Sequence, residues 1–301
     1  MKYHQPVLLK ESVEGLNIKP EGVYVDATFG GGGHSMEILK ILKKGKLIAF
    51  DQDEDAMINI PDDKRFIFVR QNFRFLRNFL KYYGFKSIDG LIADLGISSY
   101  HIDTPQRGFS FRFDTKLDMR MNTKADFSAQ DIVNSYTNDQ LTGLFRSYGE
   151  LTNARHLAMK IADARNKRAI TTVNELLEAI QDCLPKKNEN QYLAKLFQAL
   201  RIEVNKELEY LKEMLQQAAE MLKPGGRIAV ISYHSLEDRV VKNFFKTGNF
   251  ENKVKTDLYG NIERPLLPIN NKVIVPGEAE INQNNRARSA RLRIAEKIPS
   301  N

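Results

Sequence analysis

One stretch of the chain decides its fold: Val23-Tyr24-Val25-Asp26-Ala27-Thr28-Phe29-Gly30-Gly31-Gly32-Gly33-His34-Ser35. An apolar run leads directly into four consecutive glycines, and the apolar residues that follow, such as Ile38 and Leu42, have helical spacing. A strand, a glycine turn and a helix in this order are typical of a doubly wound sheet whose backbone approaches a nucleotide-like cofactor. A turn without a ligand is the alternative, but four glycines carry a backbone entropy cost. The stretch therefore predicts a cofactor-binding α/β fold.

A second apolar run, residues 46–50, ends at Asp51. An acid about 20 residues beyond such a glycine turn is placed to bind a ribose hydroxyl. The alternative is a solvated loop acid. Because Asp51 follows directly on a strand pattern, we expect ribose binding.

Strand and helix patterns continue on both sides of a long interruption. Further strands are predicted at residues 66–69, 88–94, 227–232 and 291–294. Between the strands predicted at 88–94 and 227–232, the pattern becomes loop-rich and then helical. In this interval Thr137 with Gln140 and Thr172 with Glu175 have the spacing of capping boxes. A single long helix is predicted over 191–222.

The simplest architecture is an α/β domain built from both ends of the chain. We expect a core formed by residues 1–103 and 201–301, and a mainly helical insertion at 104–200 that recognises the substrate.

Composition narrows the class of protein. The 301 residues carry a formal net charge of +7, with 42% hydrophobic and 28% charged residues, as in a soluble globular protein. No apolar stretch approaches the roughly 18–20 residues that span a membrane, and the first residues lack a signal-peptide core. Cys183 is the only cysteine, so we expect a cytoplasmic protein without an internal disulfide. The positive charge favours a polyanionic partner, although mild basicity is common, and both a monomer and a homodimer remain open.

The details of the glycine turn bear on the choice of cofactor. A dinucleotide-binding G-x-G-x-x-G would need a third glycine where Ser35 stands, whereas Asp26 lies in the preceding strand. Asp-x-x-x-Gly-x-Gly resembles the form found in methyltransferases that use S-adenosylmethionine. The turn Lys223-Pro224-Gly225-Gly226 before a strand fits such enzymes as well. A nicotinamide dehydrogenase is therefore disfavoured.

Several blocks, in this order, carry a more specific resemblance. They are Tyr3-His4-Gln5-Pro6-Val7-Leu8-Leu9, Asp26 through Ser35, Ala93-Asp94-Leu95-Gly96-Ile97-Ser98-Ser99, Arg107-Gly108-Phe109-Ser110-Phe111, Leu117-Asp118-Met119-Arg120-Met121, Phe197-Gln198-Ala199-Leu200-Arg201-Ile202, His234-Ser235-Leu236-Glu237-Asp238-Arg239 and Arg286-Ala287-Arg288-Ser289-Ala290. Over nearly its whole length the chain resembles the bacterial small-subunit ribosomal RNA cytosine-N4 methyltransferases, the RsmH or MraW family.

The resemblance implies a Rossmann-like class I methyltransferase sheet with a helical insertion domain. It also implies transfer of a methyl group from S-adenosyl-L-methionine to the exocyclic N4 of a cytidine in 16S ribosomal RNA, near the decoding site. The implied cofactor contacts are Gly32, Gly33, His34, Asp51, Phe73 and Asp94. His101 stands where the family usually has a glutamine contact. Asn122 and Asn285 also depart from the family pattern.

Two side chains are candidates for the chemistry. The ends of neighbouring parallel strands meet at one edge of a sheet, and Asp94 ends the fourth predicted strand while His234 follows the fifth. Because the N4 lone pair is delocalised into the ring, an acceptor against the N4 hydrogens would help it react. We therefore expect Asp94 to contact the cofactor or accept from the amine, with His234 as orienter or proton acceptor. His234 could instead be a capping or packing residue, and His34 could meet the ligand through its backbone N–H.

Arginines suggest where RNA binds, because guanidinium forks suit phosphates. The candidates are Arg107, Arg112 and Arg120, in a loop after the fourth predicted strand, and Arg286 and Arg288 near the end of the chain. Solvated charge is the alternative. Phe109 or Phe111 could stack on an unpaired base or pack in the core.

Other classes remain as alternatives. The same fold could methylate a protein or a small molecule, or it could serve as an assembly factor without turnover. Cytosine C5 methylation needs a cysteine nucleophile, and Cys183 is interpreted as a small buried apolar residue. With five histidines, one cysteine and no pair at ligand spacing, we predict no metal site.

Overall fold

A computed structural model describes residues 6–97, 104–270 and 272–299. The chain forms two compact units. The core unit comprises Met1–Gly96 and Leu208–Asn301, and the helical unit comprises Ile97–Glu207. The predicted insertion, 104–200, lies within the limits of the helical unit.

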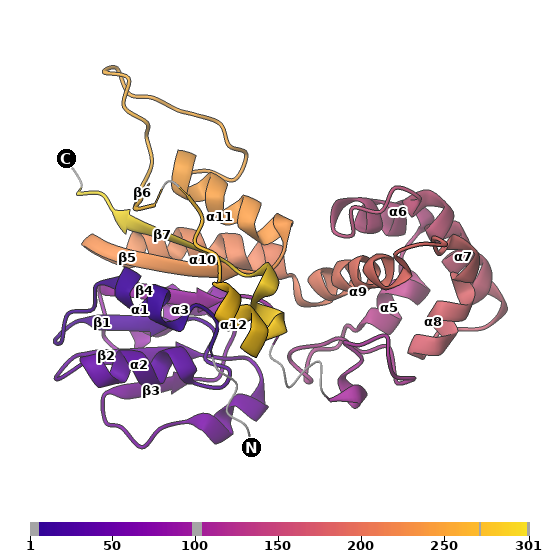
Figure 1. Cartoon of the computed structure of the whole chain (residues 1–301), viewed down its shortest axis with the longest axis horizontal. Coiled ribbons are helices and arrows are strands. Elements are labelled where there is room, and N and C mark those ends of the chain that lie inside the picture. Colours follow the sequence, from indigo (N-terminus) through magenta and orange to yellow (C-terminus); the bar gives the residue numbers. More distant parts are fainter. Residues whose placement is uncertain (1–5, 98–103, 271, 300–301) are drawn as a thin grey trace. The chain divides into compact units, whose positions relative to one another are not determined.

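The core unit is built on a mixed sheet. Its seven strands in the described residues have the order β3-β2-β1-β4-β5-β7-β6 (Figure 1). They are β1 (Val23–Asp26), β2 (Lys46–Phe50), β3 (Phe66–Val69), β4 (Ile88–Asp94), β5 (Leu222–Ser232), β6 (Leu266–Pro268) and β7 (Arg291–Lys297). The strands β3, β2, β1, β4 and β5 are parallel, and β7 pairs antiparallel with both β5 and β6. The predicted α/β fold and its six predicted strands are confirmed.

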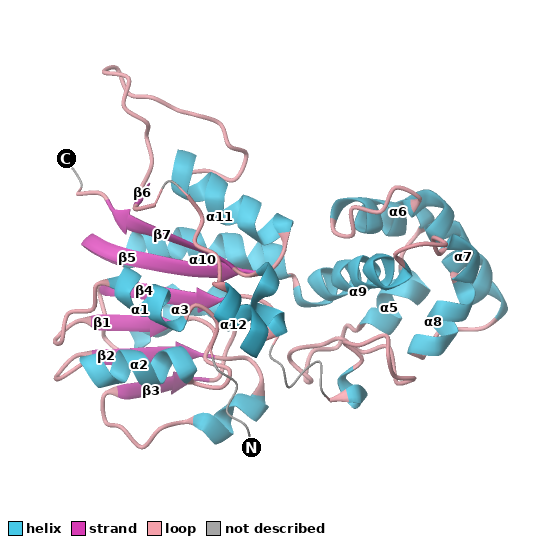
Figure 2. Cartoon of the chain, viewed as in Figure 1, coloured by secondary structure: helices cyan, strands magenta, loops and turns pink. Residues whose placement is uncertain are grey.

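Both faces of the sheet are covered, which explains the apolar runs (Figure 2). In β4 every residue except Asp94 is buried. The helices of the core unit are α1 (Leu9–Leu16), α2 (Gly33–Ile41), α3 (Leu76–Tyr82), α10 (Glu207–Met221), α11 (Ser235–Thr247) and α12 (Glu278–Gln283). Helices α3, α10 and α11 share one apolar cluster with the strands, and α1 and α2 share another.

The helical unit has an apolar core of its own. Its helices are α5 (Ala129–Ser135), α6 (Asn138–Ser147), α7 (Ala154–Lys167), α8 (Val173–Ala179) and α9 (Glu189–Asn205). The two predicted capping boxes begin α6 and α8. Cys183 is buried in this core, as expected for an apolar residue.

The prediction of one helix over 191–222 is wrong. Helix α9 ends at Asn205, and Lys206 adopts a left-handed conformation with φ of +51° before α10 begins. The Asn205 side chain donates to the backbone oxygen of Met119 at 2.8 Å and accepts from the backbone N–H of Met121 at 2.8 Å. These contacts join the end of α9 to the loop near Met119. No helix in the described part of the chain is long and apolar enough to cross a membrane.

Candidate cofactor site at the carboxyl ends of the strands

Acidic and aromatic side chains gather at one edge of the core sheet. Asp26 ends β1, Asp51 follows β2, Asp94 ends β4 and Tyr233 follows β5. Strand β1 lies between β2 and β4, so the chain order reverses beside it. A reversal of this kind opens the crevice in which open α/β sheets bind ligands.

Hydrogen bonds from neighbouring side chains fix the conformation of the glycine turn. Gly30 and Gly32 have φ of +48° and +77°, conformations that side chains rarely adopt. The Gly30 N–H donates to Oδ2 of Asp51 at 2.8 Å, and Nδ2 of Asn59 donates to the Gly30 oxygen at 3.0 Å. Helix α2 begins at Gly33, so its first backbone N–H groups point out of the turn. The arrangement suits the carboxylate of an amino-acid group.

Asp26 supports the turn from within the core. Its Oδ1 accepts from the Thr28 N–H at 3.0 Å and its Oδ2 from the Ser35 hydroxyl at 2.7 Å. Burial raises the pKa of Asp26 to about 6, although these hydrogen bonds oppose the rise. The carboxyl therefore joins β1 to the first turn of α2.

Asp94 is the most perturbed of the acids. Its Oδ1 accepts from the Tyr233 hydroxyl at 2.7 Å, and its backbone N–H donates to Oγ1 of Thr28 at 2.6 Å. Burial raises the pKa of Asp94 to about 7, the Tyr233 hydrogen bond opposes the rise, and the charges of Asp26 and Glu237 add to it. Its side chain is still 24% exposed, so a ligand can reach it. A carboxyl group with a pKa near 7 can exchange a proton at neutral pH.

His34 is a buried neutral ring beside Asp94. Its Nε2 lies 3.2 Å from the backbone oxygen of Val7 and therefore carries the proton. Burial lowers the pKa of His34 to about 4. The bare Nδ1 lies 3.9 Å from Oδ2 of Asp94. Contact with a ligand through the His34 backbone, rather than through the ring, stays a prediction.

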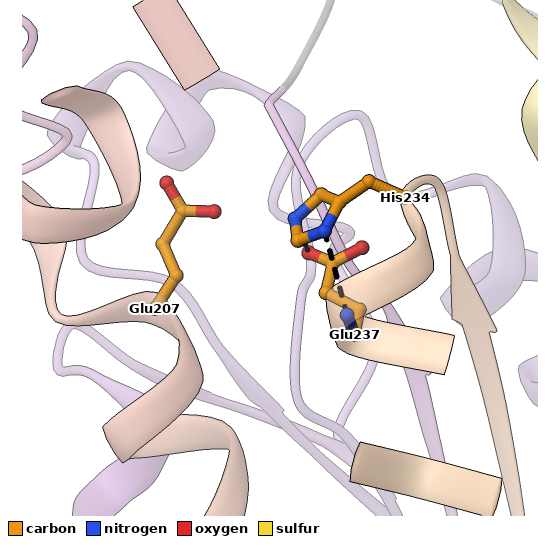
Figure 3. A group of neighbouring side chains, drawn as sticks. All are labelled: Glu207, His234 and Glu237. Atoms are coloured by element: carbon orange, nitrogen blue, oxygen red, sulfur yellow. Dashed lines mark hydrogen bonds and ion pairs between the residues drawn. The ribbon is translucent and has the colours of Figure 1, made fainter. Parts of the chain in front are cut away.

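His234 caps helix α11. Its Nδ1 accepts from the Glu237 N–H at 3.4 Å, and its Nε2 lies 3.2 Å from Oε1 of Glu237 (Figure 3). Although Nε2 is close to this carboxylate, it is buried and forms no hydrogen bond within the described part of the chain. The capping interpretation of His234 is therefore confirmed, and a role in the chemistry stays a prediction.

Sequence reasoning missed two partners in this network. No role was predicted for Tyr233, or for Glu237, whose Oε2 accepts from the Tyr233 N–H at 2.9 Å. The neighbouring positions of β4 and β5 in the sheet could have indicated that residues at their ends lie close together. The strand patterns do not predict which atoms form hydrogen bonds there.

The remaining predicted cofactor contacts differ in how far they can be placed. Phe73 begins a short 3₁₀ turn after β3, capped by Asn72, and packs partly buried against the core. Oδ1 of Asp51 accepts from the Asp53 N–H at 2.9 Å. His101 lies outside the described residues.

Two of the predicted RNA-binding arginines hold their own loop. Arg107 donates to the backbone oxygens of Arg120 and Met121 at 3.1 and 3.0 Å. Arg120 forms a bidentate pair with Asp118, at 2.8 and 2.7 Å. Both guanidinium groups therefore have a structural task that the sequence did not reveal.

The other three, Arg112, Arg286 and Arg288, are exposed. Phe109 and Phe111, the aromatic residues of this loop, pack in the core of the helical unit. Phe109 is buried, and the ring centroids of Phe111 and Phe197 lie 5.5 Å apart. Both rings therefore pack in the core, and base stacking stays a prediction.

The raised pKa values predict how stability depends on pH. Folding raises the pKa of Asp94 from an ordinary value near 4 to about 7, so the folded protein holds a proton that the unfolded chain has lost. This contribution is present at low pH and disappears as pH rises from about 4 to 7. In urea unfolding, Asp94→Asn should gain about 2 kcal/mol over the wild type between pH 5 and pH 8. A stability difference that is the same at both pH values would contradict the raised pKa.

Comparison with known proteins agrees with this geometry. The model of the MraW methylase family matches residues 1–298. A protein of Bacteroides thetaiotaomicron named ribosomal RNA small subunit methyltransferase H is 59% identical over 298 residues, which cover 99% of this chain and 98% of that protein. Proteins with the same name from Phocaeicola vulgatus and Flavobacterium johnsoniae are 58% and 56% identical, and the matches cover 98% and 99% of this chain and 97% and 99% of theirs. The chain therefore belongs to the MraW methylase family of S-adenosylmethionine-dependent methyltransferases.

Proposed function

We propose that the protein transfers a methyl group from S-adenosylmethionine to the exocyclic N4 of a cytidine in 16S ribosomal RNA of the small ribosomal subunit, in the cytoplasm. The observation that carries the proposal is the match to relatives named ribosomal RNA small subunit methyltransferase H, at 59% identity over 99% of the chain. The acidic edge of the sheet supports it with suitable chemistry.

The donor would lie across the ends of β1, β2 and β4. The methionine end fits the turn at Gly32 and Gly33, where helix α2 offers backbone N–H groups. Asp51 lies one strand away and would accept from the ribose hydroxyls. Phe73, after the next strand, would pack against the adenine. His34 and His101 complete the proposed set, and the helical unit would select the RNA.

The protein's task is alignment and proton removal. The methyl group on the sulfonium is already activated, so binding needs to bring N4, methyl and sulfur into line and exclude water. Asp94 would accept a hydrogen bond from the amine, which concentrates the N4 lone pair, and would then take a proton from the methylated product. A pKa near 7 suits that transfer at neutral pH.

Exposed arginines would contact the RNA. Arg112 in the helical unit, and Arg286 and Arg288 in the core unit, are exposed. Arg107 and Arg120 would act mainly by shaping the loop they hold, because their guanidinium groups already bind within it.

Methylation of isolated subunits tests the proposal. Small subunits from cells that lack this gene, naked 16S RNA and a basic protein mixture would each receive purified enzyme and labelled donor. We expect N4-methylcytidine in digests of the subunits or RNA, and no label in protein. Label in protein alone, or donor binding without transfer, would overturn the proposal in favour of a protein methyltransferase or of an assembly factor.

His234 needs a substitution that separates capping from chemistry. Asparagine can cap a helix as histidine does here, but it cannot take a proton. If the imidazole acts on the substrate, His234→Asn should lower the single-turnover rate at least tenfold while its thermal midpoint stays near that of the wild type. His234→Ala, which loses the cap as well, should also lower the free energy of unfolding by about 1 kcal/mol. A wild-type rate in His234→Asn would leave His234 as a capping residue only.

A further inference from the structure

Tyr233 is fixed at three points where β5 passes into α11. Its hydroxyl donates to Oδ1 of Asp94 at 2.7 Å, and its backbone N–H donates to Oε2 of Glu237 at 2.9 Å. Its ring packs against Gly96, where an added Cβ would lie 3.1 Å from Cδ2 of the ring. Gly96 has φ of +103°, a conformation that side chains rarely adopt, so both the backbone and the nearby ring favour glycine at this position.

The two oxygens of Asp94 are therefore not equivalent. Oδ1 is taken by the Tyr233 hydroxyl, while Oδ2 faces the ring of His34, whose Nδ1 lies 3.9 Å away. That nitrogen has no proton to offer, because Nε2 donates to Val7. Oδ2 thus keeps its accepting capacity toward a ligand.

We propose that Tyr233 is a positioning residue for methyl transfer: its hydroxyl holds Oδ1 of Asp94 and thereby presents Oδ2 to the target amine. The proposal rests on the methyltransferase activity proposed above and adds to it a residue that acts through Asp94. Without the hydroxyl, the carboxyl could rotate and expose either oxygen.

The charges around Asp94 explain why its carboxylate needs a hydrogen-bond donor. Asp26 at the end of β1 and Glu237 on α11 both oppose ionisation of Asp94, and His34 on α2 is neutral. On α12, Glu280 adds negative charge near Tyr233. The Tyr233 hydroxyl is the side-chain donor to Asp94 in the described core, and it lowers the pKa of the carboxyl against these effects. The phenol itself stays protonated, because burial and the Asp94 charge raise the pKa of Tyr233 far above its ordinary value.

Tyr233→Phe keeps the ring on Gly96 and removes only the hydroxyl. Hydrogen bonds to a charged group are worth about 1.5–3 kcal/mol, so the Asp94 pKa should rise by about one unit. The acidic limb of the rate against pH should move up by about one unit, and the rate at pH 6.5 should fall roughly eightfold, because a one-unit shift lowers the ionised fraction by at most about tenfold. The Michaelis constant for the donor should change less than threefold. A merely structural defect would lower the rate equally at every pH.

Tyr24→Phe is the matched control. The Tyr24 hydroxyl is also buried in the core unit, but it accepts from the Lys19 N–H at 2.7 Å, away from Asp94. It should leave the pH profile unchanged. In a protein that already carries Asp94→Asn, adding Tyr233→Phe should lower the rate of methyl transfer by less than a further factor of about two.

A readout without catalysis separates this proposal from the function. The Asp94 carboxyl carbon can be titrated by NMR in the full-length protein, with its signal assigned by its loss in Asp94→Asn. A midpoint that rises in Tyr233→Phe but not in Tyr24→Phe supports the contact, whether or not ribosomal RNA proves to be the substrate. An unchanged midpoint, or a pH profile that shifts equally in both variants, overturns the proposal.

Discussion

Asp94→Asn should lower the single-turnover rate of methyl transfer by roughly 10²–10⁴-fold, the range typical of a lost general base. The amide keeps the size and the planar shape of the carboxyl but cannot take a proton from the methylated amine. The Tyr233 hydroxyl can still donate to the amide oxygen, so the fold around it should survive. Rates would be measured with saturating donor and limiting subunits.

Asp89→Asn provides the control for Asp94→Asn. Asp89 lies on the same strand at its opposite end, is 7% exposed, and pairs with Lys223 at 2.7 Å. Removing its charge weakens the fold but leaves the acidic edge intact. If both variants lose rate equally per folded molecule, Asp94 is a structural acid and not a catalytic one.

Gly32→Ala should lower the affinity for S-adenosylmethionine by roughly tenfold to a hundredfold. A left-handed conformation costs a residue with Cβ about 1–2 kcal/mol, and here φ is +77°. The new Cβ would also lie 3.1 Å from the ring of Phe29. The turn must move to relieve both, and it takes the first N–H groups of α2 with it. Calorimetry with donor and with its demethylated product would measure the loss.

Gly31→Ala is the control for Gly32→Ala, because it also replaces a glycine of the turn but at a position without left-handed geometry. No atom lies within 4 Å of a Cβ added at Gly31, and its φ is not positive. It should therefore fold as the wild type does and bind donor within about threefold. Equal losses in the two variants would show that the donor does not depend on the left-handed geometry at Gly32.

Strands could be predicted because the sheet is buried on both faces. Such strands read as short apolar runs, and β1, β2 and β4 end in or before an acid that marks the ligand edge. The exception is β6, a three-residue strand containing Pro268, which pairs only with β7 in the described sheet. Its sequence has no alternation to detect.

Contacts between distant segments could not be predicted. The leucine spacing continues through Lys206, although the left-handed backbone there ends α9. Nothing in that spacing predicts the bonds from Asn205 to the loop near Met119. Likewise, Arg107 and Arg120 look like phosphate ligands in sequence, whereas backbone oxygens and Asp118 occupy them. Residue type indicated the chemistry available, and the tertiary fold decided where it was used.

Building the sheet from both ends of the chain imposes an order on folding during synthesis. The bond between Asp89 and Lys223 spans 134 residues, and β5 gains its second neighbour only when β7, Arg291–Lys297, has been made. The helical unit has its own core and is translated before β5, so it can fold while the first four strands still lack their partner. A nascent chain therefore exposes an open sheet edge at β4 for over a hundred codons, and this is the interval in which it is most open to chaperones and to aggregation.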